Sequence, residues 1–301
     1  MKRANPTPDW EIVLEDAAAF RLIVQAVSAV MTRVIFKVVR RPNGEYFLCV
    51  DGKDSGFSCC VSARLLIEEV NWNNDDEEAS RKFSFCVECK HVLTAVDPTG
   101  VSLKIHGNAN DATVTFFTED PDQPGHNDVS VLSTFVDGDE EFTLTSLEFE
   151  IILECDLLKL KDMIKKAKTC EAELLRIRVF VKDMGSQKNS LVTFVVEGDN
   201  QKHFQNFCHK LHYDEDGSMV VRAASDCETQ IFEIDGLTAI FDHAFPVDKL
   251  EGFVKNLPIR MLVIRMKSGL PMLLTHKLKG ETDDKEHIRF LVAPKNEEAD
   301  R

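Results

Sequence analysis

The sequence predicts an α+β protein made of two similar halves, each with two helices packed on antiparallel sheets. Two observations carry this prediction: an amphipathic helix followed by a β-hairpin recurs four times along the 301 residues, and the first two helices are about as far apart as the last two. Hydrophobic residues make up 44% of the chain and charged residues 29%. That composition allows a buried core and excludes a wholly disordered chain.

The first copy of the repeat lies near the start of the chain. A short strand is expected at 10–14, and apolar residues then recur with helical spacing over 16–31. Two β-rich runs follow at 34–39 and 46–50. Between them stands Pro42-Asn43-Gly44, whose residue types favour a tight turn.

The other three copies repeat this order of helix, strand, turn and strand. Their helices are expected at 89–96, 157–167 and 250–257. Their hairpin strands are expected at 101–105 with 112–117, 174–181 with 191–196, and 261–266 with 272–278. Further strand-like runs fill the intervals between helices, at 57–66, 83–87, 203–211, 218–223 and 230–234.

The junction between the halves lies where this periodicity stops. Residues 118–128 are rich in Glu, Asp, Pro and Gly, and 129–150 have a mixed pattern. We therefore expect an N-terminal domain over 1–145, which includes the connector, and a C-terminal domain over 146–301.

The charged residues are distributed unevenly along the chain. With 36 basic and 51 acidic side chains the formal net charge is −15, which by itself opposes binding to the phosphates of nucleic acid. Placed at 100° per residue, however, the outward faces of the four helices carry six cations against Asp162 and Asp248. The cations are Arg21, Lys90, Lys159, Lys165, Lys166 and Lys255. If the four helices line one surface, it is a basic track on an acidic protein; for any single helix, a solvated face is the simpler interpretation.

These features together resemble the DNA sliding clamps of eukaryotes and archaea, the proliferating cell nuclear antigen (PCNA) family. The similarity rests most on the closing stretch His287-Ile288-Arg289-Phe290-Leu291-Val292-Ala293-Pro294-Lys295, which acids follow. Leu270-Pro271-Met272, Phe253-Val254-Lys255 and the opening segment 10–36 also fit, so the pattern spans nearly the whole chain. The resemblance implies two DNA-clamp domains per subunit and three subunits closed head to tail into a ring, with helices lining the hole.

The same resemblance implies function and partners. The chain is expected to be a homotrimeric, non-enzymatic processivity factor of DNA replication and repair, which encircles double-stranded DNA without sequence preference. Expected partners are DNA polymerase, other proteins with a clamp-binding motif, and a clamp loader. No cofactor, metal or membrane partner is expected, and the implied location is the nucleus, or the site of viral DNA replication for a virus-encoded chain.

The resemblance also implies a partner-docking pocket beside a connector at 133–150. Its residues would be Val50, Phe142, Leu144, Phe149, Pro271, Ala293 and Pro294. Partners would insert a short helical turn with one aliphatic and two aromatic anchors. Ordinary packing is the alternative interpretation of Phe142 and Leu144. Asp137 and Asp139 stand where the family has apolar residues, and Leu291 stands where an aromatic is usual, so a shifted partner preference is expected.

Subunit contacts in the family pair an edge strand of the first domain with one of the second. The expected edge strands are 112–118 and 203–211.

Other chemistry has weaker support in the sequence. Cys86-Val87-Glu88-Cys89 has metal-ligand spacing, but no second pair follows at a zinc-finger distance, so buried thiols are expected. The nine scattered cysteines predict no disulfides, and no apolar run approaches the roughly 18 residues that cross a bilayer. No phosphate-binding, dinucleotide-binding or hydrolase motif occurs. Two alternatives stay open: a subunit of a heterotrimeric checkpoint clamp, and an unrelated α/β enzyme without known motifs.

Overall fold

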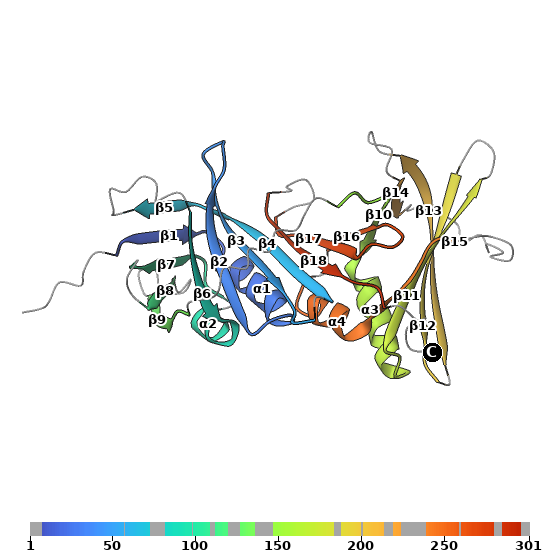
Figure 1. The fold of residues 1–301 in the computed structure, drawn as a ribbon, viewed down its shortest axis with the longest axis horizontal. Helices are drawn as coiled ribbons and strands as arrows, with labels where there is room; N and C mark the ends of the chain where they lie inside the picture. The colour runs from blue at the N-terminus through green and yellow to red at the C-terminus, as the bar shows by residue number, and fades with distance from the viewer. Residues whose placement is uncertain are drawn as a thin grey trace, which may run out of the picture. The chain divides into compact units, whose positions relative to one another are not determined.

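The computed structural model has an α+β architecture that divides into two compact units (Figure 1). Unit 1 contains residues 1–54, 61–144 and 277–288, and unit 2 contains residues 55–60, 145–276 and 289–301. The structure describes residues 8–56, 58–72, 82–97, 99–108, 112–119, 127–135, 147–183, 188–199, 201–213, 219–223, 239–258, 260–279 and 285–295.

Unit 1 contains two helices and two antiparallel sheets in its described part. Its elements are β1 (Trp10–Leu14), α1 (Ala17–Ser28), β2 (Arg33–Arg40), β3 (Tyr46–Lys53), β4 (Cys59–Ile67), β5 (Glu69–Trp72), β6 (Lys82–Glu88), α2 (Cys89–Ala95), β7 (Leu103–Gly107), β8 (Thr113–Glu119) and β9 (Asn127–Ser133). One sheet has the order β5-β1-β7-β8-β9, and the strands of the other follow the order β4-β3-β2-β6. The turn between β2 and β3 uses Gly44 with a φ of +88°, as the predicted turn chemistry requires.

Helix α1 is anchored by its apolar face to both sheets of unit 1. The Phe20 ring stacks on Phe36 of β2 with centroids 5.2 Å apart, and it lies 6.1 Å from the ring of Phe116 in β8. All three side chains are fully buried, and each contributes about 1.5–3 kcal/mol from removal of its surface from water. The Asp16 carboxylate accepts a hydrogen bond from the Ala19 N–H at 2.7 Å, which satisfies a donor in the first turn.

Unit 2 repeats the arrangement of helices and strands. Its elements are β10 (Ile151–Asp156), α3 (Leu157–Thr169), β11 (Leu174–Asp183), β12 (Lys188–Glu197), β13 (Lys202–Tyr213), β14 (Met219–Ala223), β15 (Ala239–Pro246), α4 (Val247–Val254), β16 (Met261–Met266), β17 (Met272–Lys277) and β18 (His287–Val292), which begins in unit 1. The strand order is β15-β11-β12-β13-β14-β10-β16-β17-β18. The pairing of β10 with β14 is parallel, whereas β11, β12 and β13 pair antiparallel. The predicted strand at 230–234 lies outside the described residues.

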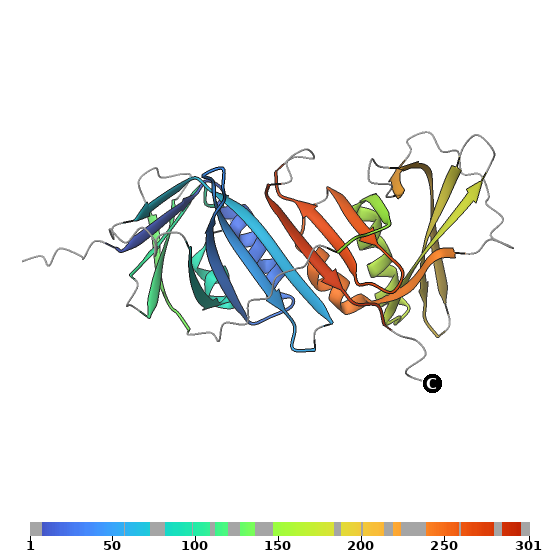
Figure 2. The same ribbon diagram turned by 45° about the horizontal axis from the view of Figure 1, so that its top comes forward.

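Helices α3 and α4 lie side by side in unit 2 (Figures 1 and 2). Helix α3 buries five side chains at helical spacing, namely Leu157, Leu160, Met163, Ile164 and Ala167. Helix α4 buries Phe253, whose ring stacks on Phe290 of β18 at 4.7 Å. The Asp156 carboxylate accepts from the Leu158 N–H at 2.9 Å and caps the start of α3. No helix in the described part of the chain is long and apolar enough to cross a membrane.

Polar contacts explain why residues 277–288 belong to unit 1. The carboxylate of Glu286 is buried, accepts a hydrogen bond from the Leu66 N–H at 3.0 Å, and pairs with the Lys279 ammonium at 3.2 Å. The Lys285 ammonium donates to Glu45 at 2.7 Å and lowers the pKa of that carboxyl. A buried carboxylate that loses such partners is costly, so these contacts tie the segment to unit 1.

A buried histidine makes the stability of unit 2 sensitive to acid. His276 lies on β17 opposite Leu262 and is fully buried. Neither of its ring nitrogens has a hydrogen-bond partner among the described residues. Burial lowers its pKa to about 4, and the positive charges of Arg260 and Lys161 act in the same direction. The folded protein therefore holds this imidazole neutral at pH values where the unfolded chain would protonate it.

We predict that unfolding becomes easier as pH falls from about 6.5 to about 4, because the unfolded state binds the additional proton in that range. At pH 7.5 and above the residue is almost entirely neutral in both states and contributes little pH dependence. At pH 5 the loss attributable to His276 is about 2 kcal/mol. Urea denaturation at pH 7.5 and pH 5, at fixed protein concentration, measures it. The His276→Leu variant should lose less stability over this interval by the same amount, and an equal loss in both proteins would refute the assignment.

Candidate nucleic-acid interface

In unit 1 the predicted cations lie on α1 and α2. Arg21 is half-buried, and its guanidinium donates hydrogen bonds to the backbone carbonyls of Leu93 and of Val96, the latter at 2.5 Å. Lys90 is exposed, and its ammonium lies 2.8 Å from the Glu88 carboxylate. Its hydrogen bond lowers the pKa of Glu88. Both cations therefore have partners within the unit.

In unit 2 the predicted cations lie on α3 and at the end of α4. Lys165 and Lys255 are exposed, and Lys159 and Lys166 are half-buried. The face opposite the buried residues of α3 is thus rich in lysine, with Asp162 as its acid. Because lysine heads reach water while their stems cover apolar surface, this face presents positive charge to solvent.

The sequence places Lys161 on the flank of α3, and it is not among the six predicted cations. Its ammonium donates to the backbone carbonyls of Leu257 at 2.7 Å and of the C-cap residue Lys255 at 3.3 Å, just after the last residue of α4. Partial burial lowers its pKa. Its position in the helix could have shown that it matters, because Lys161 is the fifth residue of α3 and Arg21 is the fifth residue of α1.

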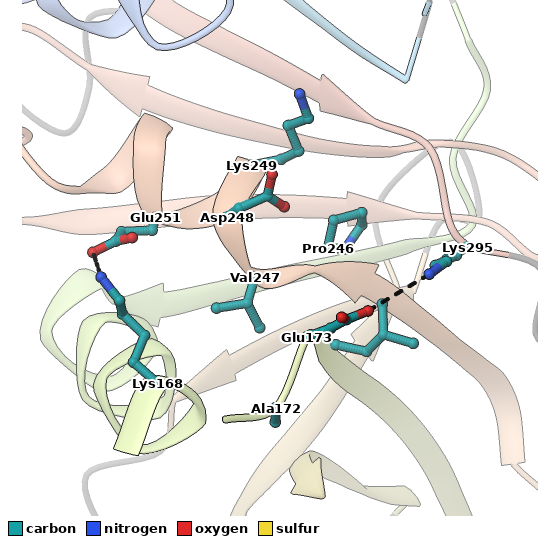
Figure 3. A pocket seen from close by; sticks show the side chains of 10 residues that line it. Lys168, Ala172, Glu173, Pro246, Val247, Asp248, Lys249, Glu251 and Lys295 are labelled. Carbon is teal, nitrogen blue, oxygen red and sulfur yellow. Dashed lines mark hydrogen bonds and ion pairs between the residues drawn. The ribbon is translucent and has the colours of Figure 1, made fainter. Parts of the chain in front are cut away.

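A pocket of about 530 Å³ borders the basic face of unit 2, at the junction of the α3–β11 turn with the start of α4 (Figure 3). Its lining includes three lysines and three acids. The ammonium of Lys168 pairs with Glu251 at 2.7 Å, and that of Lys295 lies 3.8 Å from Glu173. Since the signs balance, the pocket marks a limit of the basic face and does not extend it.

The predicted docking residues fall in different places. Phe149, Pro271, Ala293 and Pro294 belong to unit 2 and are half-buried. The Ala293 N–H donates to the Ser58 carbonyl at 2.8 Å, which fixes the start of the closing segment. Val50 belongs to unit 1 and is 1% exposed, within β3. Phe142 and Leu144 lie outside the described residues, so the docking assignment stays a prediction.

The predicted edge strand at 112–118 is wrong. This segment forms β8, which pairs with β7 on one side and with β9 on the other, so the edge strands of the five-stranded sheet are β5 and β9. Two side chains of β9, Val129 and Val131, are 57% and 63% exposed. Sequence reasoning missed β9 because it follows an aperiodic acidic stretch.

The other predicted edge strand corresponds to β13. It pairs with β12 along residues 202–210, but with β14 only along residues 209–213. The first half of β13 therefore has one open edge among the described residues. Phe204 lies in this half and is 55% exposed.

The cysteines of the CxxC motif lie in the interior of unit 1. Cys86 and Cys89 are both buried, and burial raises the pKa of Cys89 to about 11. Within the described ranges, no group of three or more His, Cys, Asp and Glu residues could hold a metal ion.

The sequence matches no protein-family profile and no curated protein. Solved structures with a similar fold include two PCNA structures. PCNA from Thermococcus kodakaraensis has a TM-score of 0.67 at 15% identity, covering 95% of this chain and 100% of that chain. Proliferating Cellular Nuclear Antigen from Entamoeba histolytica has a TM-score of 0.67 at 14% identity, covering 96% and 100%.

These similarities confirm the predicted fold class over nearly the whole chain. Two units, each with a pair of helices packed on β-sheets, form in this chain the fold of PCNA-type sliding clamps.

Proposed function

We propose that the chain is a sliding-clamp processivity factor, which encircles double-stranded DNA and tethers DNA polymerase and other replication and repair proteins. The observation that carries this proposal is the combination of a clamp fold with basic helix faces on a chain of net charge −15. A closed ring holds DNA by encirclement, so its phosphate contacts can be weak and independent of sequence. Weak contacts allow sliding, whereas a tight site would stop it.

Charge reversal on α3 tests whether the basic helix faces contact DNA phosphates. We expect Lys165→Glu with Lys166→Glu to weaken binding to duplex DNA, because two cations near phosphates become two anions. The slope of log affinity against log salt should fall by about 0.9 for each phosphate contact removed. Fluorescence anisotropy with a short duplex over a salt series measures this slope, and primer extension measures processivity.

The matched control reverses two lysines that lie away from the helices. Lys104 on β7 pairs with Glu11, and Lys267 after β16 pairs with Glu150. Lys104→Glu with Lys267→Glu changes the net charge by the same amount. Equal losses in the two double variants would mean that total charge acts, and that α3 contributes no specific track.

Assembly into a ring has support in the open strand edges. An unpaired edge with exposed apolar side chains is a site for pairing with another chain. Strand β9 presents Val129 and Val131, and the open half of β13 presents Phe204. One chain thus carries two different edges, as a head-to-tail ring of identical subunits requires. We propose that β9 of one subunit pairs with β13 of the next in a homotrimer.

A charge placed on these edges should prevent assembly. Light scattering on the purified chain is expected to give about three times 34.0 kDa. Val131→Glu and Phe204→Glu should each lower this mass to that of the monomer, because a carboxylate would be buried without a partner at the interface. The control is Val101→Glu, an equally exposed valine outside the strands.

The same mass measurement distinguishes a homotrimeric clamp from the alternative, a subunit of a heterotrimeric checkpoint clamp. A chain that stays monomeric when pure would favour a subunit of a heterotrimeric checkpoint clamp. A nuclear location, or a site of viral DNA replication, follows from either role and is part of the proposal.

We propose that partners dock beside the connector through a short helical turn with apolar anchors. Phe142→Ala with Leu144→Ala should weaken binding of a labelled peptide of this kind by roughly 30-fold, because hot-spot truncations cost about 2 kcal/mol. The ring mass should not change. An unchanged peptide affinity would show that Phe142 and Leu144 are not part of the partner-docking pocket. Val101→Ala serves as the control substitution and should leave the peptide affinity unchanged.

A further inference from the structure

Arg21 and Lys161 occupy equivalent positions in the two units. Each is the fifth residue of the first helix of its unit. Each donates to two backbone carbonyls near the C-terminal end of the second helix. In unit 1 these are the carbonyl of Leu93, in the last turn of α2, and that of the C-cap residue Val96. In unit 2 they are the carbonyl of the C-cap residue Lys255 and that of Leu257, two residues beyond it. A similar contact, shifted along the chain, is therefore built in both units, with a guanidinium in one and an ammonium in the other.

The second helices need an external cation at this end. The last carbonyls of a helix have no partner within the helix and carry the negative end of its dipole. Helices α2 and α4 contain seven and eight residues, and neither has a basic residue in its last turn. Helices this short are marginal in isolation. A cation on the neighbouring helix supplies the missing donors and the missing charge together.

The geometry leaves these two cations poorly placed to bind phosphate. Both are half-buried, and their donors point at backbone oxygens of their own unit. Arg21 also acts on the carboxyl of Asp97, whose pKa is lowered by hydrogen bonds from Thr99 and by the Arg21 charge. A phosphate at Arg21 would have to displace these interactions.

We propose that Arg21 and Lys161 are positioning residues, which fix the C-terminal ends of α2 and α4 and do not contact DNA. This inference rests on the proposed function. It removes Arg21 from the cations that are predicted to contact DNA phosphates. The cation held in place is Lys255, the C-cap residue of α4, whereas Lys90 lies in the first turn of α2, away from the end that Arg21 fixes. Because the Arg21 guanidinium is bound to backbone carbonyls and α1 contains no other basic residue, α1 supplies no cation for contact with DNA.

The first experiment needs no DNA. Hydrogen exchange of the backbone amides at 93–97 and 255–257 reports opening of the two helix ends. Lys161→Met should raise exchange at 255–257 at least tenfold, because hydrogen bonds from a charged donor are lost. Arg21→Met should do the same at 93–97. The conservative variants Lys161→Arg and Arg21→Lys keep charge and donors and should restore protection. Lys165→Met, the matched change on the exposed face of α3, should leave both segments unchanged.

The second experiment measures the salt dependence of duplex binding by the same variants. Lys165→Met should reduce the slope by about 0.9, whereas Lys161→Met and Arg21→Met should leave it unchanged. A reduced slope in the latter two, with normal exchange at the helix ends, would assign them to phosphate contact and overturn the proposal. If the wild-type chain does not bind duplex DNA at low salt, the proposed function fails, and the exchange data alone decide whether the two residues fix the helix ends.

Discussion

Burial of one apolar face of each helix is the constraint on which the rest of the structure depends. Phe20 of α1 contacts Phe36 and Phe116, which belong to different sheets of unit 1, so the rotation of α1 about its axis is fixed. In α3 the buried residues include Met163 and Ala167, so its apolar side faces the interior of unit 2. An acidic chain can therefore present basic helix faces, because packing selects which residues face outward and the sequence places lysines there.

The strength of the basic faces is limited by ion pairs at their borders. Lys90 pairs with Glu88, and Lys168 pairs with Glu251 beside the pocket of Figure 3. Each exposed pair contributes little to stability, at most about 1 kcal/mol. The larger effect of such an ion pair is on the electrostatic field of the helix face, since a paired lysine attracts phosphate less than a lone lysine does. Moderate attraction is the property that a ring sliding on DNA requires, because encirclement already prevents dissociation.

Helices and strands with a strong hydrophobic periodicity could be predicted from the sequence, whereas the pairing partners of each strand could not. Strands β1 and β16 begin and end where the pattern places them, because their side chains alternate between buried and less buried positions. Strand β9 was not predicted, because it follows an aperiodic acidic stretch and its residues show a mixed pattern. The pattern of β8 showed a strand correctly, but a strand's own residues do not reveal what pairs with its edges, so β8 was wrongly taken as the edge. The six candidate cations do lie on helices or at their ends, yet sequence could not show that Arg21 donates to backbone carbonyls, because every residue has such carbonyls.

Comparison of the two units separates the two roles a cation can have on these helices. Helices α1 and α3 share a basic residue at the fifth position, but α1 contains no other charged residue, whereas α3 carries four further lysines. The shared residue has a similar contact in both units, and the unshared lysines lie on α3 alone. A role common to both units must belong to the shared residue, and it is structural. If the chain acts as the proposed clamp, the unshared charge makes unit 2 the main contributor to DNA contact, and a homotrimeric ring would hold DNA by three basic patches, one per subunit, instead of a uniformly charged lumen.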